Sequence, residues 1–134
     1  MDDFLARPLT ARVATDGPTV RPTWYLWEDG AFWILSGPWS RLPALVRARS
    51  RIALTVDVCD LDTGVVLQVL ANGDAEVRPF DVARGRRKLV RYLGVDESRW
   101  DSRFREYLYG DVGAVWVYLR PSRLVEKDLS YRVP

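Results

Sequence analysis

PTVRPTWYLWEDGAFWILSGPWSRL, which spans residues 18–42, decides the fold of this chain. Two strand-like runs flank Asp29 and Gly30, a dipeptide that supplies the positive φ angles of a tight hairpin. Apolar and aromatic residues occupy both parities of these runs, as Trp24 and Tyr25 illustrate. A strand with one face in water would alternate apolar and polar residues, so we expect this hairpin to be covered on both faces.

The second run ends in the loop 36–41, and an amphipathic helix is expected over residues 40–49. Ser40 is the expected N-cap of this helix, and Pro43 falls in its first turn, where the missing N–H is not needed. Free backbone N–H groups at a helix start favour an anion such as a phosphate, and Arg41 lies beside them. The loop is therefore a candidate anion site.

Arg21 interrupts an otherwise apolar strand. An unpaired buried charge is unfavourable, so Arg21 either has a partner or lies partly exposed at a sheet edge. A second basic feature is the helix expected over residues 81–93, which carries Arg84, Arg86, Arg87, Lys88 and Arg91. We interpret that basic run as a solvated helix face rather than a binding site.

Composition limits the kind of protein. The 134 residues predict a single domain, 1–134, and a net charge of +2 gives no electrostatic reason to expect a nucleic acid partner. Cys59 is the only cysteine and histidine is absent, which excludes a disulfide, a Ser-His-Asp site and an ordinary zinc site. We expect no metal. Without a signal peptide or an apolar run of membrane-spanning length, a cytoplasmic protein is expected.

The remaining chain predicts a mainly β protein with α additions. Asn72 and Gly73 are interpreted as a bend or bulge within one long strand, in preference to a hairpin turn. Trp100, Phe104 and Leu108 recur at helical spacing and are expected to be core. The expected strands cover residues 10–15, 18–27, 31–36, 51–58, 65–77, 112–119 and 123–128, and the expected helices cover 2–7, 40–49, 81–93 and 96–108. Six or seven strands in local hairpins favour a small antiparallel barrel (α+β).

This order of strands, the Arg21-Pro22 pair and the loop Ser-Gly-Pro-Trp-Ser-Arg resemble the pyridoxamine 5′-phosphate oxidase-like split-barrel family, which includes FMN-binding proteins and deazaflavin-dependent reductases that use coenzyme F-420. The likeness runs from Thr10 to about Ser130 and is firmest over residues 18–58. It implies a split barrel that forms a homodimer and binds FMN or the deazaflavin coenzyme F-420 in a groove between the two barrels.

The resemblance also implies which residues bind the cofactor. The phosphate would be held by Arg21, Ser40 and Arg41, but Leu42 stands where the family has a lysine. Trp39, in the same loop, is the tryptophan best placed for ligand contact. The implied cofactor-binding set is Arg21, Pro22, Thr23, Trp24, Leu35, Ser36, Trp39, Ser40, Arg41, Leu42 and Gln68. No catalytic acid or base is assigned, because a flavin-type cofactor carries the hydride itself.

Three functions follow as alternatives. The first is a flavin-type oxidoreductase that acts on a small organic substrate at a dimer interface, with no role for nucleic acid or membrane. The second is a flavin- or tetrapyrrole-binding module without turnover, which the loss of the lysine at Leu42 would suit. The third is an interaction protein that works through its basic helix and leaves the groove empty.

Overall fold

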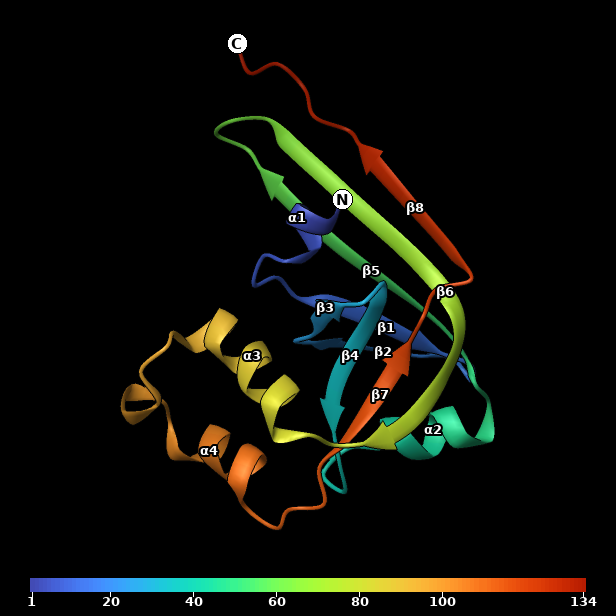
Figure 1. Ribbon diagram of the computed structural model, residues 1–134. Helices are drawn as coiled ribbons and strands as arrows, with labels where there is room; N and C mark the ends of the chain where they lie inside the picture. Colours follow the sequence, from blue (N-terminus) through green and yellow to red (C-terminus); the bar gives the residue numbers. More distant parts are fainter.

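A computed structural model describes all 134 residues and shows one split barrel with helices at its side (Figure 1). All strand pairs are antiparallel, in the order β2-β1-β5-β6-β7-β4-β3, with β8 also paired to β6. The strands are β1 (Ala11–Thr15), β2 (Thr19–Thr23), β3 (Leu26–Glu28), β4 (Ala31–Ser36), β5 (Arg51–Asp60), β6 (Val65–Pro79), β7 (Val115–Leu119) and β8 (Arg123–Asp128). The predicted antiparallel barrel is confirmed, with eight strands instead of six or seven.

The extra strand arises where the chain breaks between β2 and β3. At this break the backbone of Tyr25 bonds to side chains of a helix and not to a neighbouring strand. Its N–H donates to the Tyr92 hydroxyl at 3.1 Å, and its carbonyl accepts from Arg91 Nη1 at 3.0 Å. The hairpin that follows is as predicted, since Asp29 and Gly30 have φ angles of 57° and 71°.

β6 joins the two halves of the barrel. Its first part pairs with β5 up to Asp74, and from Ala75 onward it pairs with β7. Asn72 and Gly73 stay inside the strand with unbroken register, so the bend is confirmed and no bulge is present. A side chain at Gly73 would come within 2.9 Å of the Ser122 nitrogen, which explains the glycine at the point where β6 curves.

The helices are α1 (Asp2–Leu5), α2 (Leu42–Ala48), α3 (Val82–Leu93) and α4 (Ser102–Tyr109), with a 3₁₀ turn at Glu97–Arg99. Helix α2 begins later than predicted. Arg41, and not the predicted Ser40, is the N-cap residue. Ser40 precedes the N-cap, and its Oγ accepts the N–H of Leu42 at 3.1 Å.

The single helix predicted over 96–108 is wrong. The side chains of Asp96 and Asp101 each accept a backbone N–H, from Ser98 and Arg103, and so start two separate short helices. Trp100 lies in the extended break between them. The aromatic core predicted here is confirmed in part, because Trp100 and Leu108 are buried together while Phe104 is half-buried against them.

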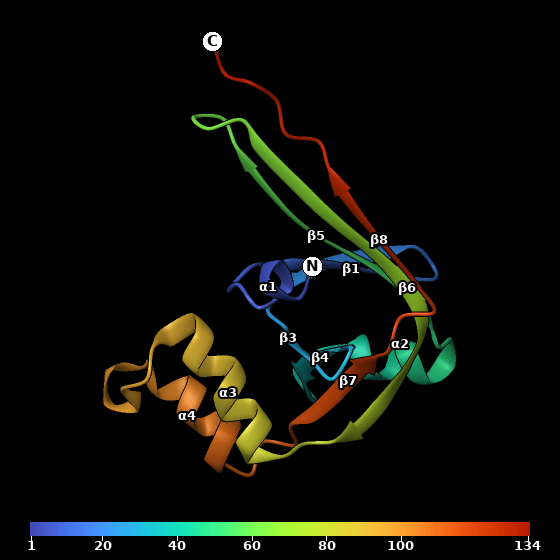
Figure 2. The same ribbon diagram turned by 45° about the horizontal axis from the view of Figure 1, so that its top comes forward.

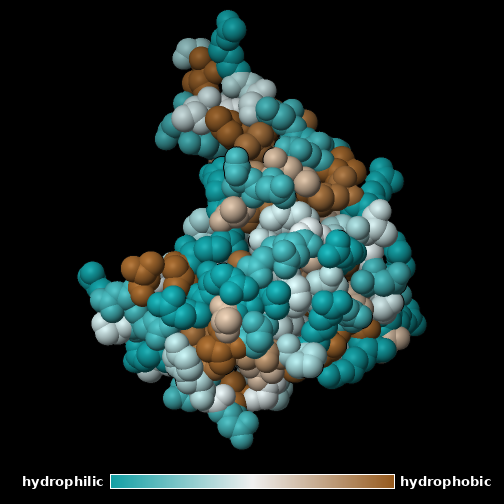
Figure 3. Space-filling model, viewed as in Figure 1, coloured by the Kyte–Doolittle hydropathy of each residue, from teal (hydrophilic) through white to brown (hydrophobic).

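The barrel interior holds the largest apolar cluster, and a second cluster of buried residues lies on the outer side of β4 and β7, beside α3. Both faces of β4 are therefore covered, as predicted. The outer face of β2 is not, since Val20 is 70% exposed. Figure 2 shows β5, β6 and β8 extending beyond the barrel as an arm, and Figure 3 shows apolar atoms along it. Exposed apolar residues of the arm include Leu61, Val65, Leu129 and Tyr131.

Candidate functional site

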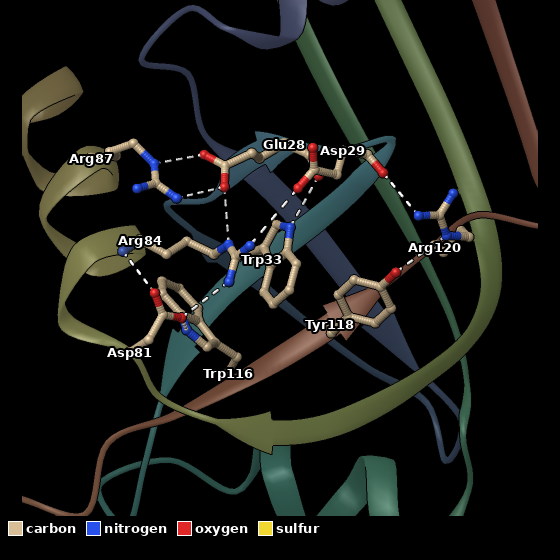
Figure 4. A network of polar contacts seen from close by, with 9 residues as sticks. All are labelled: Glu28, Asp29, Trp33, Asp81, Arg84, Arg87, Trp116, Tyr118 and Arg120. Carbon is tan, nitrogen blue, oxygen red and sulfur yellow. Dashed lines mark hydrogen bonds and ion pairs between the residues drawn. The ribbon is translucent and has the colours of Figure 1, made fainter.

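The basic residues of α3 fix this helix to the β3–β4 hairpin (Figure 4). Glu28 accepts hydrogen bonds from Arg84 Nε at 3.0 Å and from Arg87 Nη2 at 2.7 Å. The Arg84 guanidinium also lies 3.8 Å from the centre of the Trp33 ring. The hydrogen bonds from Arg87 outweigh partial burial and hold the pKa of Glu28 below its usual value.

Asp81 completes this network at the first turn of α3. Its carboxylate accepts the Arg84 N–H at 2.9 Å as the N-cap, and it also accepts Trp116 Nε1 at 3.0 Å. Burial alone would raise the pKa of Asp81, but these bonds and the Arg84 charge lower it. A solvated face was predicted for the basic run. Arg86 and Arg87 are exposed as predicted, but the prediction is wrong for Arg84, which is half-buried in this network.

Arg91 and Lys88 belong to the same helix but are held differently. Arg91 donates to four backbone carbonyls, those of Leu5, Ala6, Arg7 and Tyr25, at distances of 2.7 to 3.2 Å. It therefore caps the end of α1 and ties it to α3. Lys88 is only 5% exposed, and burial, with a smaller contribution from Arg91, lowers the pKa of its amine to about 7. An amphipathic pattern alone did not reveal this buried lysine.

Arg21 and Ser40 form the contact that matches the predicted anion site. Arg21 Nη1 donates to Ser40 Oγ at 3.2 Å, so strand β2 and the loop before α2 meet as expected. Arg21 Nε is buried and has no hydrogen-bond partner in the chain. A buried guanidinium N–H without an acceptor is unfavourable. Arg21 therefore has one partner in the chain, Ser40, and an anionic ligand fits the donor that remains.

Space is available on both sides of this pair. Next to Ser40 is a pocket of about 300 Å³, lined by Gly37, Pro38, Ser40, Pro43, Ala44, Arg47, Gly113 and Val115. A smaller pocket of about 150 Å³ lies against Arg21, Arg12, Val20 and Pro22 on the outer face of the sheet. Arg41 is exposed at the start of α2. The two cations and the hydroxyl therefore border open space.

Trp24 is engaged by the helices. Its ring stacks on Tyr92 with centroids 4.3 Å apart and planes at 4°, and on Phe104 at 5.5 Å and 12°. Two parallel neighbours leave little of either face for a cofactor ring. The place of Trp24 in the implied cofactor-binding set is therefore not supported by this arrangement. Thr23 remains beside it, with its hydroxyl donating to the Trp24 carbonyl at 3.1 Å.

Leu42 is not at the surface with Arg21 and Ser40. Its side chain is 2% exposed and packs with Val46 in the barrel core. The prediction that Leu42 replaces a phosphate-binding lysine at an open site needs correction, because the side chain points into apolar surroundings. Ser36 is buried at the end of β4, and Leu35 is partly buried against the cluster under α3.

Gln68 and Pro22 lie on the outer face of the sheet. Gln68 borders a pocket of about 250 Å³ with Arg12, Thr55, Asp57 and Leu70. Three strand spacings separate β2 from β6, on the order of 14 Å, and Arg21 pairs with the interior Val13 whereas Gln68 shares the face of Arg12, so the two side chains leave the sheet on opposite faces. The structure thus brings Arg21 and Ser40 into contact and places Gln68 at a distance on the same sheet.

Comparisons with known proteins support the fold. No known family model and no curated protein sequence matches the chain. A conserved hypothetical protein from Mycobacterium tuberculosis has a TM-score of 0.74 at 24% identity, over 94% of this chain and 81% of that one. An F-420 reductase has a TM-score of 0.64 at 22% identity, over 92% and 94%. An FAD-binding protein from Mesorhizobium loti has 0.64 at 20%, over 96% and 92%.

A candidate pyridoxamine 5′-phosphate oxidase from Listeria innocua is also similar, with a TM-score of 0.58 at 16% identity over 95% of this chain and 93% of that one. These likenesses show that the chain has the split-barrel fold of pyridoxamine 5′-phosphate oxidase-like proteins, which confirms the predicted fold. No helix of the chain is long and apolar enough to cross a membrane.

Proposed function

We propose that this protein is an oxidoreductase that binds FMN or the deazaflavin coenzyme F-420 and acts on a small organic substrate. The observation that carries the proposal is the buried Nε of Arg21, which has no acceptor although the same guanidinium is positioned by Ser40. A cofactor phosphate supplies that acceptor. The similarity to solved structures of an F-420 reductase and an FAD-binding protein supports the same class of ligand.

In this proposal the protein's own residues bind and orient the cofactor. Arg21 donates charge-assisted hydrogen bonds to the phosphate, Ser40 fixes the guanidinium, and Arg41 adds a second positive charge at the solvent side. The bound cofactor would supply the hydride chemistry, so no histidine is needed.

A second copy of the chain is part of the proposal. The outer face of β2, β1, β5 and β6 carries the exposed Val20 and three shallow pockets that reach from Pro22 to Gln68. Exposed apolar surface beside open pockets is typical of an association face. We expect a homodimer in sedimentation experiments at micromolar concentration and a monomer for Val20→Glu. A stable wild-type monomer would remove the interfacial groove from the proposal.

The alternative of a flavin- or tetrapyrrole-binding module without turnover is favoured by one observation. Leu42 lies in the core, so the phosphate site has fewer cations than the family pattern provides. Measuring hydride transfer from the reduced, protein-bound cofactor to a panel of small acceptors separates the two functions. Tight binding with no oxidation above the rate of free cofactor would identify the binding module.

Titration with FMN and with F-420 tests the cofactor site itself. Arg21→Ala should weaken the preferred cofactor by about tenfold, because charge-assisted bonds to the phosphate are lost. Arg99→Ala is the matched control, since Arg99 is an exposed arginine in the 3₁₀ turn between α3 and α4. Equal affinities for Arg21→Ala and Arg99→Ala would contradict the phosphate assignment.

A further inference from the structure

Trp39 is an exposed tryptophan that the fold holds in a defined position. Its side chain is 48% exposed, although the loop around it is short and includes the buried Gly37. A side chain at Gly37 would overlap the six-membered ring of Trp39, so the ring occupies the space that the glycine leaves free. The φ angle of Gly37 is not in the left-handed region, and the requirement for glycine here is therefore one of space.

A second contact braces the same ring from α4. Tyr107 lies with its centroid 5.0 Å from Trp39 at an angle of 35°, and Phe104 lies 6.0 Å beyond it. Phe104 in turn stacks on Trp24. These aromatic rings form a continuous line from the end of β2 to the loop, and Trp39 is its exposed end.

Trp39 precedes Ser40, the residue that binds Arg21. The backbone places the exposed indole one residue from the hydroxyl at the anion site, while the guanidinium on β2 approaches that hydroxyl from across the loop. An apolar, planar surface therefore adjoins a cationic one. A planar aromatic compound can stack face to face on such a surface. A puckered ring of the same size makes less contact with it.

We propose that Trp39, seated on Gly37 and braced by Tyr107, is the wall on which the substrate stacks, and that it selects planar aromatic substrates over non-planar ones. This inference rests on the proposed function, because it takes the cofactor phosphate to lie at Arg21 and Ser40. It assigns Trp39 to substrate specificity, whereas Arg21 and Ser40 belong to cofactor binding.

The test compares nitrobenzene with nitrocyclohexane, which share a nitro group and ring size but differ in planarity. Each probe is titrated by ligand-observed NMR into protein loaded with its oxidised cofactor, so that binding is measured without turnover. The wild type should bind nitrobenzene at least about fivefold more tightly, as expected for one aromatic stacking contact. Trp39→Ala should abolish that preference, measured with the cofactor held at saturation so that a change in cofactor affinity does not enter the comparison.

Two further variants keep the test independent of folding. Trp39→Phe should retain most of the preference, because an aromatic face remains. Gly37→Ala should remove the preference while the indole is still present, because the added methyl group displaces the ring. Tyr109→Ala is the control and should behave like the wild type, because it removes an exposed aromatic residue at the end of α4.

The outcomes separate this inference from the proposed function. A wild type that binds neither FMN nor F-420 overturns the cofactor proposal and the substrate wall together. Normal cofactor binding with no wild-type preference for nitrobenzene overturns the substrate wall alone. The same holds if the preference survives in both Trp39→Ala and Gly37→Ala with unchanged melting temperatures.

Discussion

Two arginine-containing regions of this molecule differ in how completely their guanidinium groups are paired. At the contact between α3 and the barrel, Arg84 and Arg87 bind Glu28, and Arg91 binds four backbone carbonyls. At the loop before α2, Arg21 has one hydroxyl partner and a buried Nε without any. Both regions are rich in arginine, yet only in the first do the guanidinium groups find their partners within the chain.

The difference separates structure from function. Paired guanidinium groups stabilise the position of α3 through bonds within the chain. A guanidinium whose buried Nε has no acceptor destabilises the folded chain until an acceptor binds. Substitutions at the first region should therefore change stability, and substitutions at the second should change binding.

Leu42→Lys should have the largest effect, because it puts a new charge into the barrel core beside the incomplete region. We expect a loss of about 3 kcal/mol or more in the free energy of unfolding and no gain in FMN affinity. Thermal unfolding and FMN titration of the same sample measure both quantities, with Leu42→Met as the control. Tighter FMN binding at an unchanged melting temperature would show instead that the lysine reaches a phosphate site.

Arg91→Ala should come next. It removes four hydrogen bonds from a charged donor and leaves the carbonyls at the end of α1 without it, so a loss of about 2–4 kcal/mol is expected. Chemical denaturation measures the loss. Arg103→Ala, on the exposed side of α4, should change stability by less than about 0.5 kcal/mol. A similar result for both variants would mean that the paired region is not what positions α3.

Lys88 should make stability depend on pH. Its pKa is lowered to about 7 in the folded chain, so the unfolded chain binds more protons between pH 7 and the ordinary lysine pKa of 10.5. Stability from this group should therefore rise with pH above 7, by up to about 1.4 kcal/mol per pH unit. Denaturation at pH 6.5, 7.5 and 8.5 measures the slope. Lys88→Met should flatten it, and an unchanged slope would show that Lys88 stays charged.

Arg41→Ala should have the smallest effect. Arg41 is exposed, so solvent screens its attraction for a phosphate, and cofactor affinity should fall by about threefold. The melting temperature should not change. Comparing this loss with the tenfold loss expected for Arg21→Ala by titration sharpens the contrast between a half-buried and an exposed cation. A larger loss for Arg41→Ala than for Arg21→Ala would reverse the proposed roles.

Sequence patterns predicted most of the barrel, because local chemistry determines its turns and strands. Asp29 and Gly30 supply a hairpin that needs positive φ angles, and the apolar run after Val65 remains one strand through Gly73. That Arg21 has a hydrogen-bond partner could also be predicted, since an isolated arginine in an apolar strand requires one.

Other features depend on contacts between distant segments, which periodicity does not encode. The carboxylates of Asp96 and Asp101 start new helices where spacing alone predicted one. Trp24 and Leu42 matched a motif in the sequence, but the neighbours that surround their side chains come from α3, α4 and the barrel interior. Lys88 is buried only because the helix packs on the face that carries it.

The position of β7 between β4 and β6 has a consequence for the order of folding. Ser36 pairs with Val115, so closing this half of the barrel joins residues almost 80 positions apart. Such long-range contacts slow folding because the entropy of loop closure is lost before the strand pairing compensates for it. During synthesis the segment from β1 to β6 must wait, with β4 unpaired along one edge, until residue 119 has left the ribosome.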